Sequence, residues 1–194
     1  MPKQIELHGK VECPYAWRTR LAAFEKGVSF DYIAFDAPAP DARAAHNPDR
    51  RSPLLIHGEF RLTESGVIAQ YIDEAFSGPA LLPALPTSRA RVRVDIAELG
   101  KLEADTREGT VATPEVRARL LKAYELLESK LADGRTWLGG DSPNLSDLMS
   151  WPPLAGAYFI LGITAPEELA RVTAYVARAT SRDSYRQTRP PWAP

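Results

Sequence analysis

The segment VECPYAWRTRLAAFEKG, residues 11–27, carries the only cysteine of the chain between a strand signal and a helix signal. A helix N-terminus presents unpaired backbone N–H groups and the positive end of the helix dipole, and both favour a thiolate. Pro14 suits the first helical position, which needs no N–H donor. Glu12 and Tyr15 flank the Cys13–Pro14 pair and predict a partly exposed corner. The residue types and their spacing therefore favour a reactive nucleophile at Cys13 over a buried structural cysteine.

The elements that must position this thiol alternate between strand and helix. QIELHG predicts a strand before the cysteine. Trp17, Leu21 and Phe24 then share one face of a helix, and Gly27 is expected to end that helix in the left-handed conformation. A second strand follows in VSFDYIAFD, whereas residues 37–52 predict a loop with at most one helical turn. The result is a β-α-β unit that places Cys13 at the end of its first strand.

A hairpin and a helix complete this α/β part. PLLIHGEFRL predicts two strands that turn at His57–Gly58, where glycine admits the positive φ of a tight turn. TESGVIAQYIDEAF predicts a helix. The apolar residues on the expected buried face of that helix are Val67, Ile68, Tyr71, Ile72 and Phe76.

Residues 77–87, SGPALLPALPT, have the proline-rich and uncharged composition of a linker, and the chain after them reads as helical. We therefore predict an α/β domain over 1–76, a linker over 77–87 and an all-helical domain over 88–194. The expected apolar stripe of the first helix after the linker consists of Val92, Ile96, Leu99 and Leu102.

Local capping signals mark the later helices. Thr113 and Pro114 form an N-cap and first-residue pair, and Asn144 with Asp147 forms a capping box. The helix after Asn144 is expected to kink or end at Pro152–Pro153. A last helix is expected over residues 166–180.

Composition excludes several classes of function. The 24 Lys and Arg residues nearly balance the 25 Asp and Glu residues, which predicts no nucleic-acid partner and no anionic membrane surface. The polar start of the sequence predicts neither a signal peptide nor a membrane span, and a single cysteine fits a reducing cytoplasm. The three histidines show no metal-ligand spacing, so we predict no metal site.

Three motifs in order resemble those of the cytosolic glutathione transferases. CPYAWRTRL, residues 13–21, is similar to the start of the first helix in the omega-like, cysteine-type members. It also resembles the Cys-Pro-Tyr-Cys of glutaredoxin with Ala16 in place of the second cysteine. Residues 47–76 and 136–152 resemble later landmarks of the same superfamily. The resemblance implies the glutathione transferase fold: a thioredoxin-like N-terminal domain and a C-terminal helical bundle domain.

The resemblance also implies a glutathione site. Pro53 matches the cis-proline of the family, and the backbone of Ser52 would pair with the cysteinyl part of glutathione. Glu64 and Ser65 open the next helix and would hold the γ-glutamyl amine and carboxylate. The lysine that omega-like members often place near the glycyl end has no match in FDAPAP, so this part of the site stays open, with Arg50 and Arg51 as candidates.

The catalytic residue implied is Cys13, with glutathione as co-substrate. Tyr15 and Trp151 are candidates for the pocket of the second substrate, a small electrophile or a glutathionylated molecule. Without a resolving cysteine, we expect thiol transfer or deglutathionylation through a mixed disulfide at Cys13. Conventional conjugation, isomerisation or ether cleavage is one alternative, and a non-catalytic binding or regulatory module is another. The family also implies a homodimer.

Overall fold

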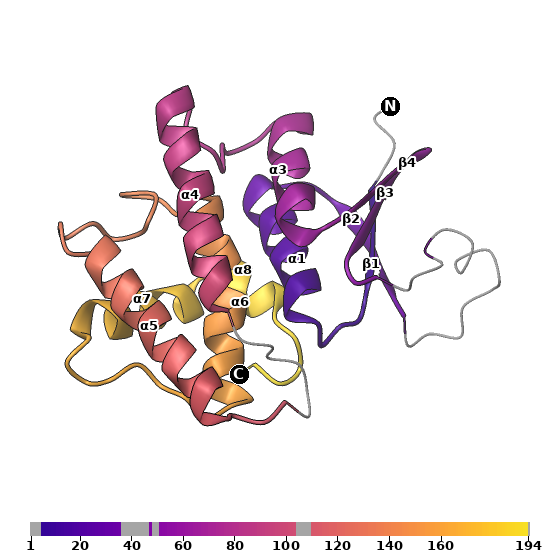
Figure 1. Ribbon diagram of the computed structural model, residues 1–194. Coiled ribbons are helices and arrows are strands. Elements are labelled where there is room, and N and C mark those ends of the chain that lie inside the picture. Colours follow the sequence, from indigo (N-terminus) through magenta and orange to yellow (C-terminus); the bar gives the residue numbers. More distant parts are fainter. Residues whose placement is uncertain (1–4, 36–46, 48–50, 104–109, 194) are drawn as a thin grey trace.

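The first part of the chain supplies a sheet and two helices that cover it. The structure, a computed structural model, describes residues 5–35, 47, 51–103 and 110–193. The strands are β1 (Ile5–Gly9), β2 (Phe30–Ala34), β3 (Leu54–His57) and β4 (Phe60–Thr63). The helices of this part are α1 (Pro14–Lys26) and α3 (Ser65–Ala75). Both helices lie between the sheet and the remaining helices (Figure 1).

The described strands pair in the order β2-β1-β3-β4. β1 and β2 are parallel because helix α1 returns the chain to the same end of the sheet. The pairs β1–β3 and β3–β4 are antiparallel, and β3 meets β4 through a tight hairpin in which Gly58 has φ 65°. The predicted β-α-β unit and the predicted hairpin are both confirmed, whereas residues 37–46 and 48–50 of the predicted loop lie outside the described residues.

Helix α1 is enclosed on most of its circumference. Pro14 is its first residue, and Gly27 ends it in the left-handed region with φ 73°, as the sequence predicts. Trp17 and Leu21 are fully buried, but Phe24 is 42% exposed, so its expected place on the buried face is wrong. The helix packs between the sheet and the helical part of the chain (Figure 1), and its Phe24 side chain is exposed to solvent.

Helix α3 shows a similar departure. Ile68 and Ile72 are fully buried, as their helical spacing predicts, and Ala69 is fully buried as well. Val67 is 48% exposed, which contradicts its expected place on the buried face. It lies about 100° around the helix from Ile68, and this rotation turns its side chain away from the sheet.

The segment before α4 is fastened to the α/β part by one carboxylate. Asp73 on α3 accepts hydrogen bonds from the backbone N–H groups of Leu81 and Leu82 at 2.8 and 3.0 Å. It also forms a buried ion pair with Lys26 of α1 at 2.8 Å. The segment is therefore packed rather than loose, since Leu81 and Leu82 are buried. The division of the chain into 1–76, 77–87 and 88–194 stays a prediction.

The remainder is helical and surrounds a second, larger core. Its described helices are α4 (Pro86–Leu102), α5 (Pro114–Lys130), α6 (Leu145–Phe159), α7 (Ala170–Ser181) and α8 (Asp183–Thr188). The last helix expected over 166–180 begins later, at Ala170, and the sequence analysis missed α8. Within the described part of the chain, no helix has both the length and the apolar character that crossing a membrane requires.

Helix α6 does not end at Pro152–Pro153, so that part of the expectation is wrong. A proline at position 153 cannot donate to the carbonyl of Met149, four residues earlier. Arg18 of α1 supplies the missing donor, because its Nε lies 2.8 Å from the Met149 oxygen. Both prolines are buried, and α6 continues to Phe159. A contact from a distant helix thus satisfies the carbonyl that proline leaves without its helical partner.

The capping predictions are confirmed, and one of them gives a clean stability test. The Thr113 hydroxyl accepts the N–H of Val116 at 3.3 Å, and Pro114 follows as the first residue of α5. We expect Thr113→Ala to lower the free energy of unfolding by about 1 kcal/mol, because one helical N–H loses its acceptor. Urea denaturation measures the loss. Thr87→Ala, at an exposed position in α4, is the control, and equal stability of the two variants would contradict the capping role.

Candidate active site

The sulfur of Cys13 lies at the N-terminus of helix α1. Cys13 is the N-cap residue, and its carbonyl accepts the first helical hydrogen bond, from the Trp17 N–H at 3.0 Å. Its Sγ lies 3.6 Å from the carbonyl oxygen of Ser52. Only 9% of the residue is exposed, so the corner is more enclosed than the sequence predicts. The thiol lies where the helix dipole favours a negative charge, but Cys13 is buried, so the expectation of a partly exposed corner is wrong.

The Ser52–Pro53 peptide bond is cis, as expected from the sequence. Ser52 presents its carbonyl oxygen to Cys13, and its hydroxyl accepts the N–H of Lys10 at 3.0 Å. Gly9 makes this close approach possible, because a Cβ atom there would lie 2.7 Å from the Ser52 Oγ. The segment that carries Lys10 and Cys13 is thereby held against Ser52, which lies just before the cis-proline and β3.

The hairpin register brings the two predicted halves of the glutathione site to one end of the sheet. Leu54, the first residue of β3, pairs with Thr63, the last residue of β4. The Ser52–Pro53 pair and the Glu64–Ser65 pair therefore leave the hairpin at the same end. Leu54 also pairs with His8 of β1, so the chain that leads to Cys13 emerges at this end too.

Glu64 has an unusual backbone. Its φ is 70°, the one positive φ of a non-glycine residue among those that the structure describes. Such a conformation costs ~1–3 kcal/mol and is found preferentially at functional sites. Ser65, the first residue of α3, is 8% exposed beside it. The Glu64 carboxylate lies 3.1 Å from the guanidinium of Arg51, so the residue before Ser52 reaches across to the start of α3.

The sequence analysis missed a pair of residues, Tyr32 and Arg20, that holds the backbone before Cys13 in place. The hydroxyl of Tyr32 donates to the carbonyl of Lys10 at 2.9 Å, and the Arg20 guanidinium stacks 4.8 Å from the centre of the Tyr32 ring. Arg20 also donates to the carbonyl of Val11 at 3.0 Å. Burial raises the pKa of Tyr32 to about 12, so its hydroxyl stays protonated at neutral pH. No local pattern in the sequence indicates this contact, because Arg20 lies on α1 and Tyr32 on β2.

Arg20 is nearly buried and carries its charge close to the thiol. It is 6% exposed, and burial lowers the pKa of its guanidinium, whereas the neighbouring Tyr32, Cys13 and Glu12 raise it. A guanidinium stays protonated throughout the usual pH range, so Arg20 is a permanent positive charge beneath the corner. The helix dipole and the charge of Arg20 therefore both favour a negative charge on the Cys13 sulfur.

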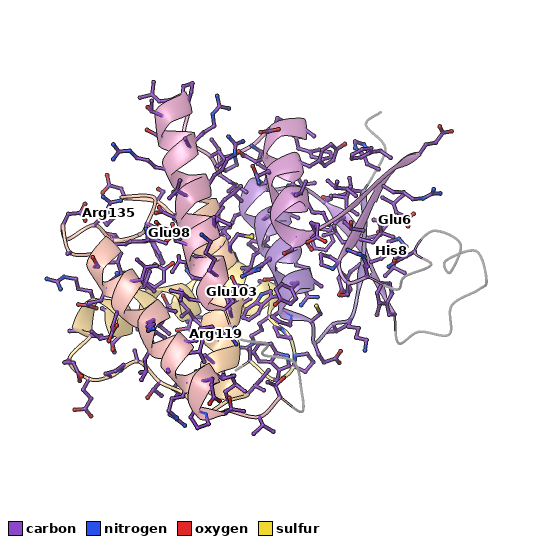
Figure 2. All side chains as sticks on the ribbon, viewed as in Figure 1. Glu6, His8, Glu98, Glu103, Arg119 and Arg135 are labelled. Atoms are coloured by element: carbon purple, nitrogen blue, oxygen red, sulfur yellow. The ribbon has the colours of Figure 1, made fainter. Side chains whose placement is uncertain are left out.

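Tyr15 and Trp151 do not meet in one cavity wall. Trp151 is 1% exposed, donates its Nε1–H to the Tyr175 hydroxyl at 3.0 Å, and lines a cavity between α6, α7 and α8. Tyr15 is half-buried at the start of α1, where the guanidinium of Arg18 lies 5.2 Å from its ring centre. Arg18 also forms an ion pair with Glu103, which directly follows α4 (Figure 2). The role of both aromatic residues toward a second substrate stays a prediction.

Several titratable side chains elsewhere in the described residues form ion pairs. His8, which is 4% exposed, lies 2.7 Å from the Glu6 carboxylate on the sheet side of the molecule (Figure 2). Among the residues that the structure describes, no three His, Cys, Asp or Glu side chains gather as metal ligands would. At Cys13, in contrast, a thiol lies near both a backbone carbonyl and a buried guanidinium.

Comparisons with known proteins agree with this arrangement. Residues 3–74 match the family model of the glutathione S-transferase N-terminal domain, and residues 90–178 match that of the C-terminal domain. Glutathione S-transferase omega-1 of Mus musculus is 28% identical over 77% of this chain and 65% of its own length. The match thus spans just under two thirds of that relative.

Two further matches span more of the known protein's own length. The Stringent starvation protein A homolog of Coxiella burnetii is 31% identical over 81% of this chain and 77% of its own length. The structure of rice GST1 in complex with glutathione superposes with a TM-score of 0.80 at 26% identity, and covers 98% of this chain and 93% of the rice chain. The two domain matches, with the omega relative, show that the chain belongs to the cytosolic glutathione S-transferase superfamily as an omega-like member.

Proposed function

We propose that the protein is a glutathione-dependent transferase of the cysteine type, which acts by thiol transfer or deglutathionylation. The observation that carries this proposal is the 3.6 Å separation between the Cys13 sulfur and the carbonyl oxygen of Ser52. In the superfamily, the residue before the cis-proline pairs through its backbone with the cysteinyl part of glutathione. A tripeptide bound in that way here would bring its own sulfur next to Cys13.

The reaction needs two exchanges that balance without a further oxidant or reductant. The Cys13 thiolate attacks the glutathione sulfur of a mixed disulfide between glutathione and a substrate, and the substrate leaves as its thiolate. A second glutathione thiolate then attacks the glutathione sulfur bound to Cys13. This step releases glutathione disulfide and restores the Cys13 thiolate. Arg20 and the α1 dipole stabilise the negative sulfur before attack and after release.

The start of α3 supplies the other half of the binding site. Exposed backbone N–H groups at a helix N-terminus bind anions, and a serine hydroxyl adds one more donor. Ser65 takes the γ-glutamyl carboxylate in this proposal, and Glu64 accepts from the γ-glutamyl amine. Arg51, which already reaches Glu64, is a candidate for the glycyl carboxylate, whereas Arg50 lies outside the described residues.

This part of the proposal predicts that Ser65→Ala weakens glutathione binding by about tenfold, because a charged acceptor loses one donor. Titration calorimetry measures the change in Kd. Ser129→Ala, at an exposed position in α5, is the matched control and should bind as the unchanged protein does. Equal affinity of both variants would place the γ-glutamyl carboxylate elsewhere.

The experiment that tests the function as a whole follows the mixed disulfide itself. Incubation with glutathione disulfide should attach one glutathione to Cys13, and mass spectrometry of the peptide that contains Cys13 detects it. Free glutathione should then release the adduct. Rapid turnover of an electrophile, with no adduct at Cys13, would instead support conventional conjugation, isomerisation or ether cleavage.

A non-catalytic binding or regulatory module is a second candidate, favoured by the 31% identity to a relative whose name is not that of a transferase. Thermal denaturation separates it from the enzyme: glutathione at millimolar concentration should raise the midpoint of an enzyme, and no shift supports the module. We keep the homodimer, the cytoplasmic location and a small electrophile or glutathionylated molecule as the second substrate within this proposal, without nucleic-acid or membrane partners.

A further inference from the structure

The segment that joins β1 to α1 ends at Cys13, and side chains hold its carbonyl groups. The Tyr32 hydroxyl on β2 donates to the carbonyl of Lys10 at 2.9 Å. The Arg20 guanidinium on α1 donates to the carbonyl of Val11 at 3.0 Å. A carbonyl held in this way cannot turn without losing its donor, so these two contacts fix the path of the backbone toward α1.

The carbonyl next to the nucleophile takes its donor from the other end of the described chain. Trp192 donates its Nε1–H to the Glu12 oxygen at 2.9 Å, across 180 positions of sequence. The Glu12 carbonyl and the Cys13 N–H belong to one peptide group, and that N–H donates to the Lys10 carbonyl at 3.2 Å. The peptide group before Cys13 is therefore held at both ends, and each hydrogen bond polarises the group and strengthens the other.

Trp192 is itself held in place. It lies in a turn after α8, in which the N–H of Ala193 donates to the carbonyl of Pro190 at 3.1 Å. Its ring packs edge-on against the buried ring of Trp17, with 5.7 Å between the ring centres. An indole has a single N–H donor in the plane of its ring, so a fixed ring also fixes the direction of that hydrogen bond.

Helix α8 ties this turn to α1. Trp17 donates its Nε1–H to the Thr188 hydroxyl at 2.9 Å, and the Arg20 Nε donates to the Thr188 carbonyl at 3.0 Å. Tyr185 packs on Trp17 with 4.8 Å between the ring centres. Helix α8 thus lies against α1 (Figure 1), and Arg20 connects it to the Val11 carbonyl. The backbone before the thiol and residues 183–193 therefore form one hydrogen-bonded unit.

We propose that Trp192 is a positioning residue for Cys13, because its hydrogen bond to the Glu12 carbonyl orients the peptide group that leads into the nucleophile. Trp192 acts through the backbone and not on the sulfur. A nucleophile that loses its orientation reacts more slowly from the bound complex, even when binding is unchanged. This effect on the rate rests on the proposed thiol-transfer function, whereas the effect on the backbone does not.

Two substitutions separate the hydrogen bond of Trp192 from its packing. Trp192→Phe keeps an aromatic ring beside Trp17 but loses the N–H donor, and Trp192→Ala loses both. At saturating glutathione disulfide, the Cys13 thiolate attacks one sulfur and the other glutathione leaves as its thiolate. We expect both variants to form this adduct about tenfold more slowly, because the Glu12 carbonyl has lost its donor. Mass spectrometry follows the adduct.

Two further measurements distinguish this effect from a loss of binding or of stability. Titration calorimetry should give an unchanged Kd for glutathione in both variants, since neither substitution touches Ser65 or the Ser52 backbone. The melting temperature should fall clearly in Trp192→Ala, which loses the packed ring, and little in Trp192→Phe. The rate of adduct formation would thus follow the N–H donor, and the stability would follow the ring.

Amide hydrogen exchange, measured by NMR, tests the positioning role without any reaction. In Trp192→Phe the Cys13 N–H should exchange about tenfold faster, whereas that of Leu21, in the middle of α1, should not change. Trp137→Phe is the matched control, because it makes the same substitution at a buried indole in the helical part of the chain. It should lower the melting temperature but change neither the exchange of the Cys13 amide nor the rate of adduct formation.

The failure of one proposal can be told from the failure of the other. If the unchanged protein forms no adduct, the thiol-transfer function is wrong, and the amide exchange alone decides the role of Trp192. Equal exchange of the Cys13 amide in Trp192→Phe and the unchanged protein would overturn the positioning role. So would an adduct that forms at the original rate in Trp192→Phe and slowly only in Trp192→Ala, since packing would then be the whole effect.

Discussion

Cys13→Ser is expected to lower the rate of disulfide exchange with glutathione by roughly 10³-fold or more, as the loss of a nucleophile does. A serine oxygen cannot form the mixed disulfide, and no other cysteine exists in the chain to replace it. The rate is measured as reduction of a glutathionylated peptide at fixed glutathione concentration. Thermal denaturation of the variant with and without glutathione shows that the fold and the binding site persist.

The same variant separates the proposed reaction from conjugation. A serine hydroxyl can still donate a hydrogen bond to the glutathione thiolate, so conjugation of an electrophile should persist or rise in Cys13→Ser. Cys13→Ala removes that donor as well and should lose both activities. If Cys13→Ser retained disulfide exchange at the original rate, the cysteine mechanism would be wrong, whatever the fate of glutathione binding.

Turn and capping residues correctly predicted where several helices and the hairpin begin or end. Gly27 ends α1 and Gly58 turns the hairpin because each adopts the positive φ that its position requires. Thr113 and Asn144 cap their helices through their own side chains. These residues act on neighbours within a few positions, so their signal is complete in a short stretch of sequence.

The features that the sequence did not reveal depend on distant partners. At Pro153, for example, Arg18 from another part of the chain donates to the Met149 carbonyl, which the proline leaves without its helical donor. Arg20 on α1 stacks on Tyr32 on β2, and the residues around each of them give no sign of this contact. Long-range pairing of this kind has no local pattern. The sequence therefore predicted the position of Cys13 at the start of α1 and the cis-proline, but neither the buried cation nor the enclosure around the thiol.

The second large effect is a loss of stability on substitution of Asp147, whose carboxylate lies in the first turn of α6. Asp147 is fully buried, and each of its oxygens accepts two hydrogen bonds. One oxygen accepts the Leu138 N–H at 2.8 Å and the Tyr175 hydroxyl at 2.9 Å. The other accepts the N–H groups of Gly139 at 3.0 Å and Asn144 at 2.9 Å. This carboxylate holds the loop before α6, the start of α6 and helix α7 together.

Asp147→Asn is expected to lower the free energy of unfolding by about 3–5 kcal/mol, the usual cost of breaking a buried charged network. The amide keeps one accepting oxygen, but in either orientation its NH₂ group faces at least one backbone N–H donor, which loses its acceptor. Urea denaturation at pH 7 measures the loss. Asp141→Asn, an exposed aspartate in the same loop, is the matched control and should change stability by less than about 0.5 kcal/mol.

The stability difference between the unchanged protein and Asp147→Asn should also depend on pH. Burial raises the pKa of Asp147 from its ordinary 3.8 to about 6, and the four donors oppose that rise. The folded state therefore holds this proton more tightly than the unfolded state, so the contribution is complete below about pH 4 and is lost as the pH rises through 6. The asparagine variant lacks this titration, and the difference should be larger by about 1 kcal/mol at pH 5 than at pH 7. A difference that shrinks toward pH 5 would mean that the four donors outweigh burial and hold the carboxylate in its charged form.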